Sequence, residues 1–134
     1  MTFLLDTDVI SALRRRERNP AVVRWVESQR TADFHLSVVT IGEIERGITQ
    51  QCRDPAFAHD LAVWLDRVLA WYDDRILLVD TATARRWGQL SAKLGYDSAD
   101  LLIAATALEH GLTVVTGNVR HFEPTGVPTL NPFK

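Results

Sequence analysis

DLLIAATALEHGLTVVTGN, residues 100–118, places an apolar helix directly before an apolar strand. The run LLIAATAL is apolar on nearly every side, which in a globular protein is typical of a helix buried on most sides or facing a subunit interface. Gly111 is the residue type that most often ends a helix. We therefore predict a helix over about 98–110 and a strand over 112–116.

The same alternation continues on both sides of this segment. Further strands are predicted at 2–5, 34–38, 76–79 and 127–130. Two helical stretches follow the first strand, the second beginning at Pro20 after Asn19 as N-cap. Later helices are predicted at 40–52, at 54–72 opened by Asp54-Pro55, and at about 81–95, capped by Asp80 or Thr81 and ended by Gly95. Strands separated by whole helices need crossover connections. The fold class is therefore α/β, with a mostly parallel central sheet of four to five strands flanked by helices.

The composition indicates one domain without covalent cross-links. The chain has 134 residues, of which 46% are hydrophobic and 24% charged, and this length suits one hydrophobic core. Cys52 is the single cysteine, so no internal disulfide is expected. No apolar run approaches the roughly 20 residues that cross a bilayer, and we expect a cytoplasmic protein without membrane or secretion segments.

Acidic and polar side chains follow the strands, at the edge where parallel sheets bind ligands. They are Asp6 and Asp8 after the first strand, Glu43 in the helix after the second, Asp97 and Asp100 at the start of the apolar helix, and Thr116 with Asn118 after the fourth strand. A carboxylate at the end of a buried strand costs free energy unless it is paired or metal-bound. This edge is therefore the candidate functional site.

A divalent cation is the neutralising partner that the sequence favours. The chain contains only two lysines, Lys93 and Lys134, so arginine or a cation must neutralise a cluster of Asp6, Glu43 and Asp100. Oxygen ligands without His/Cys spacing point to Mg²⁺, with Mn²⁺ as a possible substitute. The formal charge of −2 argues against a uniformly basic nucleic-acid surface, although bound cations would offset the carboxylates.

Each acid also has an ordinary structural explanation. Asp8 alone reads as a helix N-cap. Glu43 would complete a capping box with Thr40, and Asp97 is a further N-cap candidate before Asp100. Only the joint pattern favours the cation site over these explanations.

Four segments resemble PIN-domain proteins and, within them, VapC-type toxins of toxin–antitoxin pairs. They are FLLDTDVISAL, TIGEIERG, DLLIAATALEHGLTVVTGN and VRHFEPTGVPTLNPF, and together they cover almost the whole chain. The resemblance implies one PIN domain over 1–134 and a metal-dependent endoribonuclease. By motif, Asp6 matches the acid after the first strand, Glu43 the acid of the E-x-x-x-G helix, and Asp100 the acid before the IAATA run.

The loop TGNVRHF departs from the family pattern. Asn118 stands where the family has an acid or an amide, His121 where a further Asp is frequent, and Gly117 where arginine is frequent. The resemblance implies that Asn118 is a neutral ligand or a hydrogen-bond donor to phosphate, and that Thr116 holds this loop in place.

The resemblance also implies a mechanism. Asp6 and Asp100 would be the main metal ligands, and Glu43 a ligand or an orienter of the attacking water. In such metal-assisted hydrolysis the ion activates a water, orients the scissile phosphate and stabilises charge on the leaving oxygen.

The resemblance implies macromolecular partners as well. We expect a substrate of structured RNA, tRNA or rRNA, a cognate VapB-type antitoxin that inhibits the enzyme, and a homodimer. Operator DNA would be bound only through the antitoxin. The apolar helix 101–108 and the tryptophans of helix 54–72 are candidate contact surfaces.

Two other functions stay open on the sequence. A phosphatase of the haloacid dehalogenase type would use an aspartyl nucleophile in FLLDTDVI, but it needs a lysine near the phosphate and a later acidic pair. Lys93 is the only interior lysine, and TGNVRHF supplies no such pair. The second alternative is a catalytically degenerate PIN-like module that binds RNA or a partner protein.

Overall fold

A computed structural model describes residues 1–51 and 53–134. The strands are β1 (Phe3–Leu5), β2 (Phe34–Ser37), β3 (Ile76–Leu77), β4 (Thr113–Val115) and β5 (Thr129–Leu130). The helices are α1 (Thr7–Arg14), α2 (Pro20–Glu27), α3 (Val38–Gln50), α4 (Pro55–Trp71), α5 (Thr81–Leu94), α6 (Ala99–His110) and α7 (Val119–Phe122), with short 3-10 turns between some of them. Cys52, the last residue of the helix predicted at 40–52, lies outside the described residues.

The five strands form one parallel sheet in the order β3-β2-β1-β4-β5. The central strand β1 pairs Phe3 with Phe34 of β2 and with Thr113 of β4. Every pair is parallel, as strands joined through helices require. The predicted α/β class and its parallel sheet are confirmed.

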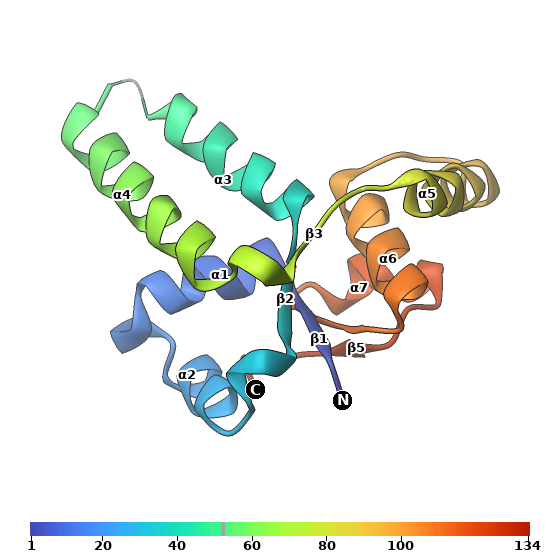
Figure 1. The fold of residues 1–134 in the computed structure, drawn as a ribbon, viewed down its shortest axis with the longest axis horizontal. Coiled ribbons are helices and arrows are strands. Elements are labelled where there is room, and N and C mark those ends of the chain that lie inside the picture. The colour runs from blue at the N-terminus through green and yellow to red at the C-terminus, as the bar shows by residue number, and fades with distance from the viewer. Residues whose placement is uncertain (52) are drawn as a thin grey trace.

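Helices cover both faces of the sheet because successive strand residues point to opposite faces. Phe3 and Leu5 of β1 pack into a core with residues of α1, α2 and α4, whereas Leu4 packs with Ile103 and Ala107 of α6. Figure 1 shows the blue and green helices α1–α4 on one side of the sheet and the orange helices α6 and α7 on the other. The result is a three-layer sandwich with β1 at its centre.

Most helix ends follow the predicted local chemistry. Asp54 accepts a hydrogen bond from the Phe57 N–H, and Asp80 accepts one from the Thr83 N–H. Gly95 and Gly111 end α5 and α6 with φ of 80° and 67°, in the left-handed region that favours glycine.

Asn19 is a partial exception. It precedes Pro20 as predicted, but its side chain makes no capping bond to α2. Its amide instead donates to the carbonyls of Ala12 and Arg15 at the end of α1, which also accept backbone hydrogen bonds from Arg15 and Arg18.

The apolar helix α6 is buried on most sides, as its sequence predicts. Leu101, Ile103, Ala104, Ala105 and Ala107 have no exposed surface. Over the described residues, no helix has the length and apolar character to span a membrane.

Candidate functional site

Asp6 lies at the carboxyl end of the central strand and is held from two sides. Its Oδ1 accepts a hydrogen bond from the Thr7 N–H at 2.8 Å and so caps α1. Its Oδ2 accepts a hydrogen bond from the Thr116 hydroxyl, also at 2.8 Å. The residue is only 5% exposed. The first and fourth strands therefore bring Asp6 and Thr116 together, as the topology of a parallel sheet predicts.

Asp8 also belongs to this site. The interpretation of Asp8 as the N-cap of α1 was wrong, because Asp6 occupies that position. Asp8 Oδ2 instead accepts hydrogen bonds from the Gly117 N–H at 2.8 Å and from Asn118 Nδ2 at 3.4 Å. Its Oδ1 is buried and has no hydrogen-bond partner within the part of the chain that the structure describes. A buried carboxylate oxygen without a donor is able to accept a hydrogen bond from water or to bind a cation.

The loop after β4 is shaped by these contacts. Thr116 is fully buried, and its hydroxyl accepts a hydrogen bond from the Asn118 N–H at 2.9 Å while donating to Asp6. A Cβ placed on Gly117 would lie 2.9 Å from Asp8 Oδ2 and 2.9 Å from the Phe133 ring. A larger residue would have to displace Asp8 or Phe133, so this close approach relies on glycine at the position where arginine is frequent in the family that the sequence resembles.

Asp100 lies in the first turn of α6, next to the same edge. Its Oδ2 is 3.0 Å from Nδ1 of His121 on α7. The prediction that Asp97 caps α6 was wrong, because the cap position is Ser98 and Asp97 accepts a hydrogen bond from Trp87 Nε1.

Glu43 joins the site through a neighbour of Asp6. The Thr7 hydroxyl donates to Glu43 Oε1 at 2.5 Å and lies 3.3 Å from the Thr40 hydroxyl. The interpretation of Thr40 and Glu43 as a capping box was wrong, because Ser37 caps α3 and Thr40 lies inside the helix. The side chain of Glu43 thus serves a tertiary contact rather than its own helix.

Asp6, Asp8 and Asp100, here called the acidic cluster, share one region of negative potential. Burial, with the charges of Asp8 and Asp100, raises the pKa of Asp6 to about 7, although the hydrogen bonds from Thr116 and Thr7 act in the opposite direction. Burial also raises the pKa of Asp8, and the charge of Asp100 acts in the same direction. Among the described residues, no lysine or arginine forms an ion pair with these three carboxylates, and an opposite charge such as a bound cation would favour their ionised form.

The donor set of this cluster fits a hard divalent cation. It offers carboxylate oxygens, including the unpartnered Oδ1 of Asp8, which are the ligands that Mg²⁺ and Mn²⁺ prefer. As the side chains stand, no three His, Cys, Asp or Glu residues of the described ranges are grouped closely enough to hold an ion. Asp100 is engaged by His121 and Glu43 by Thr7, so both carboxylates would have to turn towards a shared ion.

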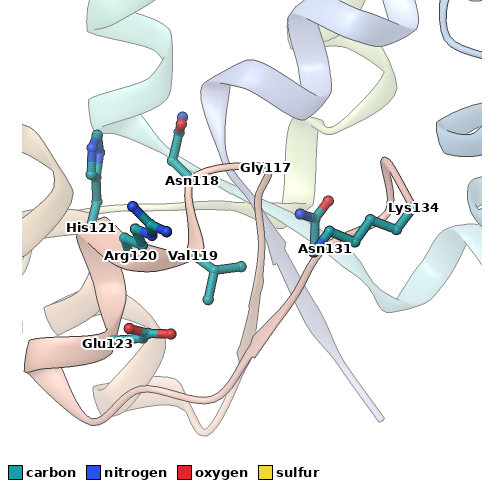
Figure 2. Close-up of a pocket in the computed structure, with 8 residues that line it drawn as sticks. All are labelled: Gly117, Asn118, Val119, Arg120, His121, Glu123, Asn131 and Lys134. Atoms are coloured by element: carbon teal, nitrogen blue, oxygen red, sulfur yellow. The ribbon is translucent and has the colours of Figure 1, made fainter.

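Two cavities adjoin the acidic cluster. The first, here called the loop cavity, has a volume of about 460 Å³ and is lined by residues that include Gly117, Asn118, Arg120, His121, Asn131 and Lys134. Figure 2 shows Arg120 and His121 on one side of it and Asn131 with Lys134 on the other. The second, here called the Tyr96 cavity, is lined by Tyr96, Ser98, Asp100, Arg120 and His121. Arg120 and His121 therefore line both cavities.

The structure brings most of the predicted site residues together. The charge of Asp100 acts on Asp6, and Asn118 contacts Asp8. Glu43 is linked to Asp6 through hydrogen bonds of Thr7. Asp8 was predicted at this edge from the sequence but was explained as an N-cap and assigned no role as a ligand. The signal was present, because Asp8 lies in the first helical turn after the same strand that presents Asp6.

Comparison with known proteins gives consistent matches over nearly the full chain. The PIN domain family model matches residues 3–126. The VapC ribonuclease Y4jK of Sinorhizobium fredii is 32% identical, covering 98% of this chain and 97% of its own. Toxin FitB of Neisseria gonorrhoeae is 33% identical, covering 97% of each chain. A solved structure of FitAB bound to an IR36 DNA fragment aligns with a TM-score of 0.86 at 31% identity, covering 99% of this chain and 96% of that one.

Proposed function

The chain belongs to the PIN-domain family, and from this premise we propose that it is an endoribonuclease of the VapC type and the toxin of a toxin–antitoxin pair. Two full-length relatives are named a ribonuclease and a toxin. The observation that carries the proposal is the buried carboxylate of Asp6, which shares its edge of the sheet with Asp8 and Asp100 and has its pKa raised to about 7 by burial and by their charges. Such strongly perturbed groups concentrate at functional sites.

We propose Mg²⁺ or Mn²⁺ as the cofactor, held by Asp6, Asp100 and Asp8. When bound, the cation would supply Lewis-acid stabilisation of the charge that develops on the phosphodiester. Thr116 and Thr7 fix the two oxygens of Asp6, so this carboxylate is already oriented before RNA arrives. A ligand with a fixed orientation costs little reorganisation in the reaction.

Glu43 and Asn118 have supporting roles in this proposal. Glu43 is held by Thr7 through one oxygen, which leaves the other to orient the attacking water and accept its proton. Asn118 is exposed and holds Asp8 at 3.4 Å only, a distance at which a hydrogen bond is weak. Its amide can therefore turn towards a phosphate oxygen of the substrate.

We propose that the inhibitory partner, a VapB-type antitoxin, covers the apolar groove of α1 and α4. The groove has a volume of about 280 Å³ and includes Leu13, Trp64 and Trp71, with Trp71 63% exposed. Arg14 lies above the rings of Phe57 and Trp64, at 5.5 and 6.0 Å. A neighbouring cavity runs from these residues to Thr7 and Glu43, so a chain that lies in the groove can reach the acids.

The remaining partners are proposals of the same kind. FitAB, which has this fold, is described as bound to DNA, and this supports an operator complex formed through the antitoxin. We further propose a homodimer, and tRNA or rRNA as the substrate class, because single-stranded loops of structured RNA expose the bases that a protein can read.

The decisive experiment incubates total cellular RNA with three forms of the purified, partner-free chain. These are the wild type, Asp100→Asn, and the control Asp60→Asn, which removes an exposed acid on α4. Discrete fragments are expected from the wild type and Asp60→Asn with Mg²⁺ or Mn²⁺, and none from Asp100→Asn or with EDTA. Intact RNA with folded, metal-supplied wild type would instead favour a catalytically degenerate binding module.

A further inference from the structure

We propose that the surface formed by the loop cavity and the Tyr96 cavity binds one unpaired nucleotide of the RNA, next to the phosphodiester bond held at the acidic cluster. This inference rests on the proposed nuclease function and deepens it. It assigns binding roles to Arg120, Tyr96 and Asn131, which the catalytic proposal does not use.

Arg120 supplies the positive charge that this position needs. An RNA strand that approaches Asp6, Asp8 and Asp100 brings its own negative charge, and a nearby fixed cation lowers the resulting repulsion. Arg120 is exposed and lines both cavities. Among the residues that the structure describes, its guanidinium makes no ion pair or hydrogen bond. Its donors are therefore free for a phosphate, which a guanidinium binds through two parallel bonds.

Tyr96 supplies an aromatic face at the same place. It follows Gly95, which ends α5, and it is 45% exposed. Its ring lines a cavity that also contains Asp100 and Arg120. An exposed aromatic beside a cation is the combination on which single-stranded nucleic acids stack and bind. A large aromatic would otherwise gain free energy by burial, so its exposure at this site is consistent with a stacking role.

The loop cavity offers amide groups to the edge of a base. Asn131 Oδ1 accepts a hydrogen bond from the Phe133 N–H at 2.9 Å, so the orientation of this amide is fixed. Its Nδ2 donates to no group in the described part of the chain and lines the cavity. Asn118 lies across from it, and Lys134 adds a second cation beside Asn131 (Figure 2). Amide groups can read the hydrogen-bonding edge of an unpaired base.

The concave shape selects an unpaired nucleotide over a duplex. The loop cavity, at about 460 Å³, lies in the range of roughly 300–1,000 Å³ that small ligands occupy. A base inside a duplex is stacked and paired, and entering a pocket requires its extrusion at a cost of a few kcal/mol. Bulged, looped or terminal nucleotides avoid that cost.

The test measures RNA binding without cleavage, in the Glu43→Gln background with Mg²⁺, because Glu43 lines neither cavity. The probes are a short, unstructured, fluorescein-labelled RNA and the blunt duplex of the same sequence, followed by anisotropy over a series of salt concentrations. The variants are Arg120→Gln, Tyr96→Leu and Tyr96→Phe, together with Arg85→Gln. Arg85 is exposed on α5, so this last variant removes the same charge from elsewhere. Thermal unfolding checks that each variant folds.

The expected results separate the two parts of the surface. Arg120→Gln should lower the slope of log K against log salt by about 0.7, the value for one phosphate contact in a single strand, whereas Arg85→Gln should leave the slope unchanged. Tyr96→Leu should weaken single-strand binding about tenfold, and Tyr96→Phe should keep it, because stacking needs only the ring. The duplex should bind more weakly and respond little to Tyr96→Leu.

Two results would overturn the inference without bearing on the nuclease assignment, and a third would do the reverse. Equal effects of Arg120→Gln and Arg85→Gln would reveal only a response to net charge. Duplex binding as tight as single-strand binding would exclude an unpaired nucleotide. If instead Tyr96 and Arg120 control binding while wild-type protein never cleaves RNA, the nucleotide site stands and the nuclease proposal fails.

Discussion

The carboxylate of Asp8 and the backbone N–H of Gly117 lie 2.8 Å apart, which joins the first turn of α1 to the loop after β4. The contact spans 109 residues of sequence. It places the loop that carries Asn118 directly beside the acidic cluster, so the position of Asn118 depends on the absence of a side chain at Gly117.

Replacing Gly117 by alanine should disrupt this contact. The added Cβ would meet Asp8 Oδ2 and the Phe133 ring at 2.9 Å, and overpacking of this kind typically costs about 1–3 kcal/mol. We expect a loss of stability of that order in chemical unfolding, and a loss of RNA cleavage. The matched control is Gly88→Ala, because Gly88 lies in α5 with open space around it. That variant should be stabilised by roughly 0.5–1 kcal/mol. Equal effects of the two substitutions would contradict the proposed role of the Asp8–Gly117 contact.

Thr116 should be replaceable by serine but not by valine. Its hydroxyl donates to Asp6 and accepts from the Asn118 N–H, and valine leaves both partners without a bond. Leaving buried polar groups unpaired costs about 1–3 kcal/mol each. We expect Thr116→Val to lower the unfolding free energy by that order and cleavage by at least tenfold, with Thr116→Ser close to wild type. Urea unfolding and RNA cleavage measure the two effects, and an active Thr116→Val enzyme would show that Asp6 needs no orienting bond.

The metal-free protein should lose stability as the pH rises. The folded pKa of Asp6 is raised to about 7, above the ordinary value of 3.8. Between these values the folded chain holds a proton that the unfolded chain releases, so the free energy of unfolding falls from about pH 4 to about pH 7. A shift of this size corresponds to about 4 kcal/mol.

Urea unfolding in EDTA across this pH range, for wild type and Asp6→Asn, measures the effect. The difference between the two proteins should be small near pH 4 and should favour Asp6→Asn above pH 7. Mg²⁺ at the upper pH should restore the stability of the wild type, because a bound ion stabilises the folded state. A pH-independent difference would show that Asp6 has an ordinary pKa.

The groove of α1 and α4 should matter for the antitoxin and not for cleavage. Trp71 is exposed at this groove, and exposed tryptophans at interfaces often contribute 2 kcal/mol or more, roughly thirtyfold in affinity. We expect Trp71→Ala to weaken binding of the cognate antitoxin while free toxin cleaves RNA normally. Titration calorimetry with the antitoxin measures this, and Leu78→Ala, which removes an exposed apolar residue that lines no described cavity, is the control. Unchanged affinity in Trp71→Ala would place the antitoxin elsewhere.

The sequence predicted the elements well because their ends carry strong local signals. Gly95 and Gly111 end helices, and Asp54 and Asp80 begin them, where expected. The order of the strands was not predicted, because alternation of helices and strands requires parallel pairing without saying which strands are neighbours. The strand order is decided by which faces of the strands and helices pack against one another in the folded core.

The errors at the site have one physical cause. Asp8, Glu43 and Asp97 each lie near the start of a helix, where a local rule assigns an acid to capping. In the structure their carboxylates bind Gly117, Thr7 and Trp87 instead. These partners lie 10, 36 and 109 residues away along the chain, so a local rule cannot find them, whereas the joint pattern of acids at one sheet edge indicated the candidate site.

Asp6 is buried at the end of the central strand, whereas the two cavities beside the acidic cluster are lined largely by exposed side chains. Asp6 and Thr116 are buried and hydrogen-bonded to each other, so substitutions at either position act on the stability of the fold as well as on the site. Arg120 and Tyr96 are exposed and carry no part of the hydrophobic core. Substitutions at Arg120 and Tyr96 therefore cost the core little, so related chains could diverge in the RNA that they bind at the proposed nucleotide site while keeping the same acidic cluster.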